Sequence, residues 1–170
     1  MRTRQIVVQP YDAAWERDFQ DIRAELRAAL GPTALRIEHV GSTAVPGLSA
    51  KPIIDIDVVI RDAAAFPDAA ARLGTIGYLH EGDLGIAGRE AFRYEGKPHL
   101  RAHHLYVCPL DSPELRRHLA FRDYLRAHPE AVRAYSRVKE EAARLYPEDI
   151  EGYIRHKAPF IAEVYRKIGV

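Results

Sequence analysis

The sequence predicts an α/β (α+β) fold, with a mixed β-sheet core, flanking helices and a helical C-terminal third. The run at residues 53–60 is apolar except for Asp55 and Asp57, which is typical of a central strand covered on both faces. Two further candidate strands, 91–95 and 101–108, are separated by Gly-Lys-Pro, which favours a hairpin. From residue 111 onward, helix signals replace strand patterns.

The first two thirds alternate strands and helices. A short strand is expected at residues 6–8, and Asp12 is placed to cap a helix that ends at Gly31. The apolar side of this helix is expected to be Trp15, Phe19, Ile22, Leu26 and Leu30. A strand at 35–40 then leads into a Gly-Ser turn, and Asp62 caps a short helix that follows the central strand. The glycine-rich residues 74–88 predict a turn, a strand and a loop.

The C-terminal third carries three helix signals. Pro113 and Pro129 occupy the first position of two predicted helices, and Pro147 ends the second. The apolar side of the second is expected to be Val132, Tyr135, Val138, Ala142 and Leu145. In the last segment a stripe is expected along Ile150, Ile154, Lys157, Ile161, Val164 and Ile168. Pro159 is expected to kink or split this last helix.

Length and composition favour one ordinary domain over residues 1–170. The 25 basic and 24 acidic residues give a net charge of +1, so a nucleic-acid partner is not expected. A single cysteine, Cys108, excludes an internal disulfide and fits a reducing cytoplasm. No segment is apolar enough to span a membrane. We therefore expect a cytoplasmic protein without a membrane partner, whose oligomeric state is left open.

The central strand carries the most informative pair of residues. Alternate side chains of a strand share a face, so Asp55 and Asp57 point the same way. Two neighbouring carboxylates in an apolar strand repel each other unless a cation or hydrogen-bond donors lie between them. Mg²⁺ is the natural neutraliser. The alternative is that the pair binds helix termini or arginines.

A Gly-Ser turn, Gly41-Ser42, precedes this strand. Glycine lets the backbone approach a phosphate closely, and the serine hydroxyl can donate to it. With Mg²⁺ held by the two aspartates and phosphates held by the turn, the combination suits an NTP substrate. The expected chemistry is in-line nucleotidyl transfer.

Residues 38–48 (EHVGSTAVPGL) and 51–55 (KPIID) closely resemble the signature of the GrpB family, small proteins placed in the nucleotidyltransferase superfamily. The resemblance extends over nearly the whole chain. The further matching residues are Pro10-Tyr11-Asp12 with Trp15 and Phe19, Gly88-Arg89 with Phe92-Arg93, residues 121–126 with Tyr135 and Lys139, and Tyr153 with Lys157.

The resemblance implies a nucleotidyltransferase-like core, with Gly41, Ser42 and Thr43 at the phosphate turn and Asp55 and Asp57 as ligands of Mg²⁺ or Mn²⁺. Enzymes of this superfamily commonly place a third carboxylate on a later strand, as base or metal ligand.

The corresponding strand here, 101–107, contains no acid. His104 is the residue that can replace the carboxylate as a neutral base or ligand, and Tyr106 stands where many relatives have histidine.

Four basic residues are candidates for phosphate contacts. Arg89 and Arg93 share a face if their strand is continuous, and both can bind phosphate oxygens bidentately. Lys51 precedes Pro52, and Lys157 interrupts the aliphatic stripe of the last helix. Each has a simpler alternative, as an exposed arginine, a solvated loop lysine or a lysine that snorkels to water. His39 is either a core histidine or a group at the site.

Two functions follow from these residues. The first is a Mg²⁺-dependent nucleotidyltransferase that moves an NMP group from an NTP to an acceptor bearing a hydroxyl or phosphate. The alternative is a non-catalytic accessory domain that binds a nucleotide or a coenzyme A precursor, since the third carboxylate is missing and the family resembles domains attached to a coenzyme A biosynthetic kinase. An RNA-binding role is disfavoured by the near-neutral charge.

Overall fold

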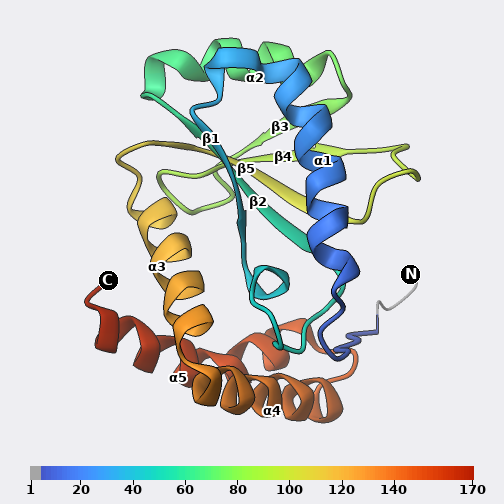
Figure 1. Cartoon of the computed structure of the whole chain (residues 1–170), viewed down its shortest axis with the longest axis vertical. Coiled ribbons are helices and arrows are strands. Elements are labelled where there is room, and N and C mark those ends of the chain that lie inside the picture. Colours follow the sequence, from blue (N-terminus) through green and yellow to red (C-terminus); the bar gives the residue numbers. More distant parts are fainter. Residues whose placement is uncertain (1–4) are drawn as a thin grey trace.

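A five-stranded mixed sheet forms the centre of the computed structural model, which describes residues 5–170 (Figure 1). The strands are β1 (Arg36–Val40), β2 (Ile54–Ile60), β3 (Tyr78–Gly82), β4 (Glu90–Tyr94) and β5 (His103–Pro109). Their order across the sheet is β1-β2-β5-β4-β3. The β2–β5 pair is parallel and the other three pairs are antiparallel. The predicted mixed sheet and the hairpin between β4 and β5 are therefore confirmed.

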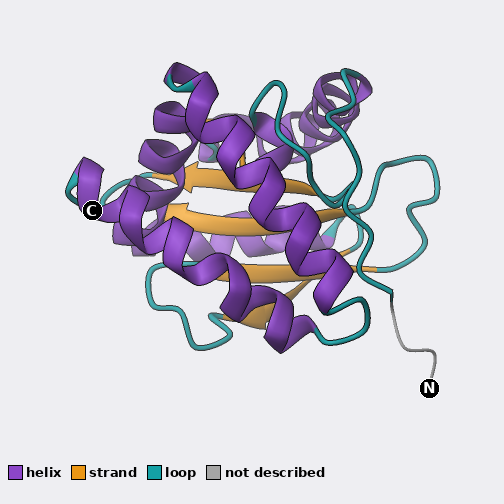
Figure 2. Ribbon diagram, turned by 90° about the horizontal axis from the view of Figure 1, so that it is seen from below, coloured by secondary structure: helices purple, strands orange, loops and turns teal. Residues whose placement is uncertain are grey.

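Helices cover both faces of the sheet. They are α1 (Ala14–Leu30), α2 (Phe66–Gly74), α3 (Pro113–Ala127), α4 (Pro129–Leu145) and α5 (Ile150–Ile168). In Figure 1 α4 and α5 cross below the sheet, and in Figure 2 the strands lie between layers of helices. The helical C-terminal third is as predicted. Among residues 5–170, no helix combines the length and the apolar character that crossing a membrane requires.

Strand parity separates the core from the polar face. Ile54, Ile56 and Val58 of β2 point to the side where α1 and α2 pack, and they belong to the main buried cluster. The five residues predicted for the apolar side of α1 are all buried there. Val59 points the other way and packs with Leu115 of α3. Asp55 and Asp57 share that second face, between the sheet and the C-terminal helices.

Polar side chains bind backbone N–H groups at or just before three helix starts, although Ala13 and not the predicted Asp12 is the N-cap residue of α1. The Asp12 carboxylate accepts a hydrogen bond from the Ala14 N–H at 2.9 Å, before α1. Asp62 accepts from the Ala65 N–H before α2, and the Ser112 hydroxyl accepts from the Leu115 N–H at the start of α3. These side chains satisfy backbone donors that a helix start leaves free.

The strand predicted at residues 6–8 is wrong. The segment makes one isolated bridge, in which Gln9 and Ala50 exchange two backbone hydrogen bonds of 3.0 and 2.9 Å. Pro10 follows and has no N–H to continue a ladder. The Ile6 N–H instead donates to the Pro147 carbonyl, which fastens this segment to the loop between α4 and α5.

The stripe predicted for the last helix is wrong in its first half. Ile150 and Ile154 are 47% and 54% exposed, whereas Gly152 and Tyr153 are buried. A Cβ at Gly152 would lie 2.4 Å from the Tyr146 ring, so glycine permits a close approach that directs Tyr153 inward. The helix is not split at Pro159. Leu145, predicted on the apolar side of α4, is likewise 47% exposed.

Candidate functional site

Gly41 and Asp55 lie in direct contact at the end of β1. Val40 pairs with Asp55 across the antiparallel β1–β2 ladder, so the next residue, Gly41, reaches the aspartate side chain. A Cβ at Gly41 would lie 2.2 Å from Asp55 Oδ2, and Gly41 has φ +74°. This backbone region is almost restricted to glycine. The turn predicted from Gly-Ser therefore needs its glycine for both conformation and space.

Ser42 binds a buried lysine that comes from α4. Lys139 Nζ donates to Ser42 Oγ at 2.5 Å, and the lysine is 3% exposed. Its ammonium also lies 5.0 Å from the centre of the Tyr135 ring. Burial lowers the pKa of Lys139 well below its usual range, and the charges of Lys157 and Lys51 lower it further.

Two further lysines approach the same point. Lys157 Nζ lies 4.4 Å and Lys51 Nζ 5.3 Å from the centre of the Tyr153 ring. Burial, followed by the charge of Lys51, lowers the pKa of Lys157 to about 8. The three lysines line a cavity of about 160 Å³, which we call the lysine pocket. Its other lining residues are Ser42, Ala50, Ile53, Asp55, His104 and Tyr153.

A second cavity lies beside the first. It has a volume of about 150 Å³ and is lined by Val40, Gly41, Asp55, Arg89, Tyr106 and His118; we call it the arginine pocket. The guanidinium carbon of Arg89 lies 4.0 Å from the centre of the Tyr106 ring, a cation–π contact. Asp55 is the residue common to the two linings. The Gly41-Ser42 turn borders both, because Gly41 faces one cavity and Ser42 the other.

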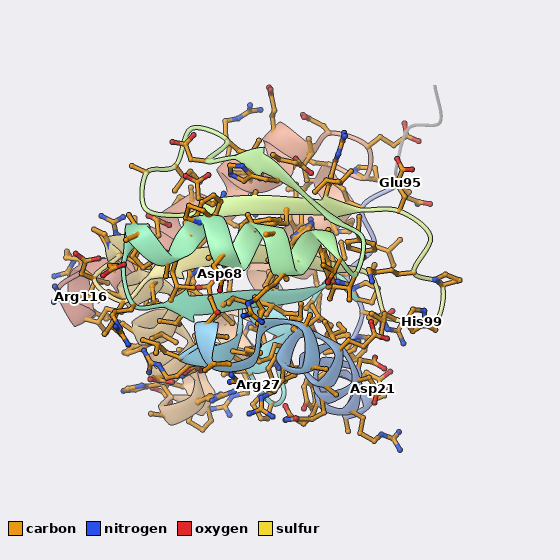
Figure 3. The ribbon with its side chains drawn as sticks, turned by 90° about the horizontal axis from the view of Figure 1, so that it is seen from above. Asp21, Arg27, Asp68, Glu95, His99 and Arg116 are labelled. Atoms are coloured by element: carbon orange, nitrogen blue, oxygen red, sulfur yellow. The ribbon has the colours of Figure 1, made fainter. Side chains whose placement is uncertain are left out.

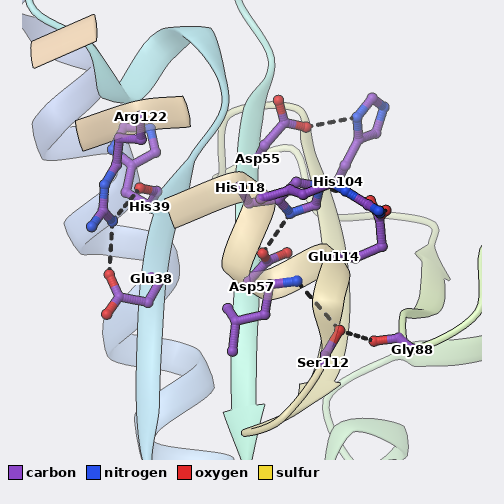
Figure 4. A network of polar contacts seen from close by, with 12 residues as sticks. Glu38, His39, Asp55, Asp57, Gly88, His104, Ser112, Glu114, His118 and Arg122 are labelled. Carbon is purple, nitrogen blue, oxygen red and sulfur yellow. Dashed lines mark hydrogen bonds and ion pairs between the residues drawn. The ribbon is translucent and has the colours of Figure 1, made fainter. Parts of the chain in front are cut away.

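Asp57 is fully buried, and only one of its two carboxylate oxygens has a hydrogen-bond partner among residues 5–170. Its Oδ2 accepts a hydrogen bond from His118 Nδ1 at 2.6 Å (Figure 4), while Oδ1 is buried without a partner among residues 5–170. Burial raises the pKa of Asp57, against the lowering effect of His118. His118 also lies 3.6 Å from Glu114, one helical turn earlier on α3.

His104 occupies the neighbouring position on β5. The parallel register places His104 beside Asp55 and Tyr106 beside Asp57. His104 Nδ1 lies 2.9 Å from Asp55 Oδ1 (Figure 4). The strand from which a third carboxylate was expected therefore presents an imidazole and a phenol to the two aspartates.

Neither Glu38 nor Glu95, the two acids that could have supplied a third carboxylate, takes that position. Glu38 is paired with Arg122 at 2.8 Å, and Glu95 is exposed in the loop after β4, at the margin of the molecule (Figure 3). Within the described residues, no three His, Cys, Asp or Glu side chains form a group that could hold a metal ion. A cation at this site would be bound by the two aspartates and by groups of a bound substrate.

The structure brings most of the proposed site residues together. The two cavities gather Gly41, Ser42, Lys51, Asp55, Arg89, His104 and Lys157. Thr43 is buried behind the turn, where its Oγ1 lies 2.9 Å from His39 Nε2. Arg93 is exposed on β4 and lines neither cavity. Arg89 precedes β4, so the two arginines do not share one strand as expected.

Two residues of the site were not among the candidates. His118 is 61 positions from Asp57 in the sequence, and no local pattern links the two. Lys139 is 97 positions from Ser42, but its position was informative. It replaces an apolar residue on the buried side of α4, between Tyr135 and Ala142. A lysine at such a position needs an anion or a polar partner.

His39 belongs to the core. Its ring stacks on Phe19 with centroids 4.6 Å apart, and burial lowers its pKa to about 4, against the raising effect of Glu16. Because the unfolded chain binds this proton near pH 6.5, stability is full above that pH and is lost as the pH falls toward 4. We expect a loss of up to about 3 kcal/mol from this group.

The measurement is denaturant unfolding between pH 7.5 and 4.5 of the wild type and of His39→Gln, which cannot titrate. The stability of the variant should change less with pH. Parallel curves for the two proteins would contradict the assignment.

Comparison with known structures identifies the fold of this chain. Residues of the chain superpose on a cytoplasmic RNA terminal U-transferase with a TM-score of 0.52 and 17% identity, covering 76% of this chain and 42% of that one. The fold is therefore that of the nucleotidyltransferases.

The chain belongs to the GrpB family. The family model described as GrpB protein matches residues 5–167. The crystal structure of the conserved protein GrpB from Enterococcus faecalis superposes with a TM-score of 0.83 and 34% identity, over 95% of this chain and 96% of the other.

The relatives differ in length. The glutamate-rich protein GrpB of Alkalihalophilus pseudofirmus is 31% identical, with 96% of each chain covered. YqkA of Bacillus subtilis is 35% identical over 93% of this chain, which spans 46% of YqkA. A dephospho-CoA kinase of Mycolicibacterium paratuberculosis is 31% identical over 98% of this chain and 48% of its own length. The chain thus spans about half the length of several relatives.

Proposed function

We propose that this protein binds an NTP with its phosphates in the lysine pocket and transfers the NMP group to an acceptor. The observation that carries the proposal is the convergence of three lysines, the Ser42 hydroxyl and the Asp55 carboxylate on one small cavity. Lysines and a glycine-containing turn are groups that bind phosphate oxygens, and the carboxylate is suited to a cation that the phosphates share.

The aspartates fit a divalent cation. Carboxylate oxygens are the ligands that Mg²⁺ and Mn²⁺ prefer. Asp57 Oδ1 is a buried oxygen without a partner, and Asp55 shares its sheet face. Asp55 and Asp57 would hold the ion, which would supply charge neutralisation at the phosphates and a lower pKa for an attacking hydroxyl.

In the proposed reaction, the acceptor oxygen forms a bond to the α-phosphorus of the NTP. The bond from that phosphorus to the bridging oxygen breaks, and pyrophosphate leaves with the electron pair. The hydroxyl proton passes to His104 through the Asp55 carboxylate, which lines both cavities and whose Oδ1 lies 2.9 Å from His104 Nδ1. Lys51, Lys139 and Lys157 bind the charge of the departing pyrophosphate.

A second function rests on the missing third carboxylate. His104 and Tyr106 stand beside the aspartates on β5, so the chain can keep a nucleotide pocket without catalysing transfer. The relative named dephospho-CoA kinase is about twice as long as the matched part. Under this alternative the chain is an accessory domain that binds a nucleotide or a coenzyme A precursor.

The test is isothermal titration of ATP, GTP, CTP and UTP, with and without Mg²⁺, into the wild type, Asp55→Asn and Asp57→Asn. We expect Mg²⁺ to strengthen binding to the wild type, and each variant to lose about tenfold or more in affinity, equivalent to 1.4 kcal/mol. Equal NTP affinity of all three folded proteins would falsify the metal assignment. Release of pyrophosphate separates the enzyme from the accessory domain, which binds without turnover.

A further inference from the structure

The two cavities meet at Asp55, which lines both, and we assign them separate roles. Gly41 faces the arginine pocket and Ser42 the lysine pocket, so the turn forms part of the wall between them. In an in-line displacement, the attacking and leaving oxygens lie on opposite sides of the phosphorus. If the leaving phosphates occupy the lysine pocket, the attacking oxygen comes from the arginine pocket.

We propose that the arginine pocket receives the reacting end of the acceptor, and that the acceptor is a small molecule with an anionic group close to its hydroxyl. The inference rests on the proposed function and specifies its second substrate. It also reassigns Arg89, which the sequence grouped with Arg93 as a contact of the NTP phosphates.

The Arg89 guanidinium in the arginine pocket, which Asp55 also lines, supports an anion. The Arg89 guanidinium stacks on Tyr106, and its Nε is buried without a hydrogen-bond partner among residues 5–170. A guanidinium stacked on a ring keeps its N–H donors in its own plane, where a carboxylate or phosphate can accept two of them. The other basic group, His118, is already engaged by Asp57 and Glu114. An anion in the cavity would accept hydrogen bonds from the Arg89 guanidinium.

Arg89 is held in position by its neighbour in the sequence. The Ser112 hydroxyl donates to the Gly88 carbonyl at 2.6 Å (Figure 4), and Gly88 has φ +82°. A Cβ at Gly88 would lie 3.0 Å from Ser112 Oγ, so the backbone before Arg89 packs closely on the start of α3. A guanidinium fixed in this way loses less freedom on binding than one on a mobile loop.

The size of the cavity argues for a small group. About 150 Å³ corresponds to roughly five water molecules at ~30 Å³ each, below the ~300 Å³ at which pockets enclose drug-sized ligands. The net charge of +1 provides no general attraction for a nucleic-acid strand. A compact hydroxy-phosphate or hydroxy-carboxylate is small enough for the cavity and does not need a general attraction for nucleic acid.

The experiment titrates glycerol 3-phosphate, glycerate and glycerol into the full chain saturated with Mg²⁺ and the non-hydrolysable analogue α,β-methylene-ATP. The variants are Arg89→Gln, Arg89→Lys and Lys157→Gln, each checked for folding by circular dichroism and melting. We expect at least one of the two anions to bind, glycerol to bind at least tenfold more weakly, and Arg89→Gln to weaken anion binding about tenfold or more. The better of the two anions identifies the group.

Lys157→Gln is the matched control. It should weaken the ATP analogue and leave anion affinity unchanged. Arg89→Lys keeps the positive charge but loses the two parallel N–H donors of the guanidinium. Its anion affinity should therefore lie between those of the wild type and Arg89→Gln. If Arg89→Gln does not fold, Arg89→Lys is the variant that tests the inference.

Four results would overturn the inference: no anion binds, the anion displaces the analogue, glycerol binds as tightly as the anions, or anion affinity depends on Lys157 and not on Arg89. Tighter binding of a short oligoribonucleotide than of either anion would overturn the small-molecule assignment. If the ATP analogue does not bind, the proposed function is contradicted. Anion binding that depends on Arg89 in the same protein would still support the anion site.

Discussion

Gly41→Ala is expected to abolish nucleotide binding while leaving a folded protein. The new Cβ would lie 2.2 Å from Asp55 Oδ2 and 3.0 Å from Asp55 Cβ, so the carboxylate must leave its position. The backbone conformation adds about 1–3 kcal/mol of strain. For a chain of this size, each kcal/mol lowers the Tm by about 2–4 °C. We expect an affinity loss of about 100-fold or more, since both the turn and Asp55 are displaced.

Gly96→Ala is the matched control for this variant. Gly96 has φ +69° and nothing within 4 Å of its Cβ position, so the substitution introduces strain without a clash. It should lower the Tm by a few degrees and leave nucleotide affinity unchanged. Titration and thermal melting of both variants separate the two effects. If Gly41→Ala bound nucleotide as well as Gly96→Ala, the contact between the turn and Asp55 would be irrelevant to binding.

Lys139→Met is expected to make the protein more stable and its nucleotide binding weaker. Burial lowers the pKa of Lys139, so its charged form is disfavoured in the fold and favoured in the unfolded chain. Replacing buried ion pairs by apolar side chains of similar volume is neutral or stabilises proteins by about 1–4 kcal/mol, and we expect a gain in this range when the single buried lysine is replaced. The lost contact with a charged phosphate should weaken binding by about 10- to 100-fold, the range of 1.5–3 kcal/mol for such bonds.

The pH dependence gives this prediction a second readout. The destabilisation by Lys139 is present below the unfolded lysine pKa of about 10.4 and disappears as the pH rises through it. The gain in stability from Lys139→Met should therefore be large at pH 7 and shrink toward pH 10.5. Lys167→Met, at an exposed position of α5, should change neither stability nor affinity appreciably. A less stable Lys139→Met protein would assign Lys139 a structural role.

Much of the fold could be predicted because its signals are local. The Asp62 cap, the prolines at the starts of α3 and α4 and the apolar spacing of α1 each depend on a few neighbouring residues, and the structure confirms them. The last helix shows where this fails. Five aliphatic residues favoured one face, but Gly152 packs against Tyr146, and Gly152 and Tyr153 are buried in place of Ile150 and Ile154. Periodicity alone does not contain that tertiary contact.

The candidate site also has one part that local signals indicate and another that depends on tertiary contacts. Asp55 beside Gly41 follows from a strand, a turn and the antiparallel pairing of β1 with β2. The partners of Asp57 and Ser42 could not be predicted, because His118 and Lys139 arrive from helices 61 and 97 positions away. Arg89 lies before β4 and lines the arginine pocket, whereas Arg93 is exposed on β4 and lines neither cavity.

The contact between Ser42 and Lys139 has a consequence for how the protein folds. Contacts between residues far apart in sequence require loop closure before they stabilise the fold, and we expect this one to form late. The sheet with α1 can assemble before α4 docks, whereas the lysine pocket cannot exist until that docking is complete. A ligand held by both parts should therefore slow unfolding far more than it speeds folding, because its contacts are absent from an early transition state. Stopped-flow refolding and unfolding with and without nucleotide would show this as a change confined to the unfolding arm of the chevron.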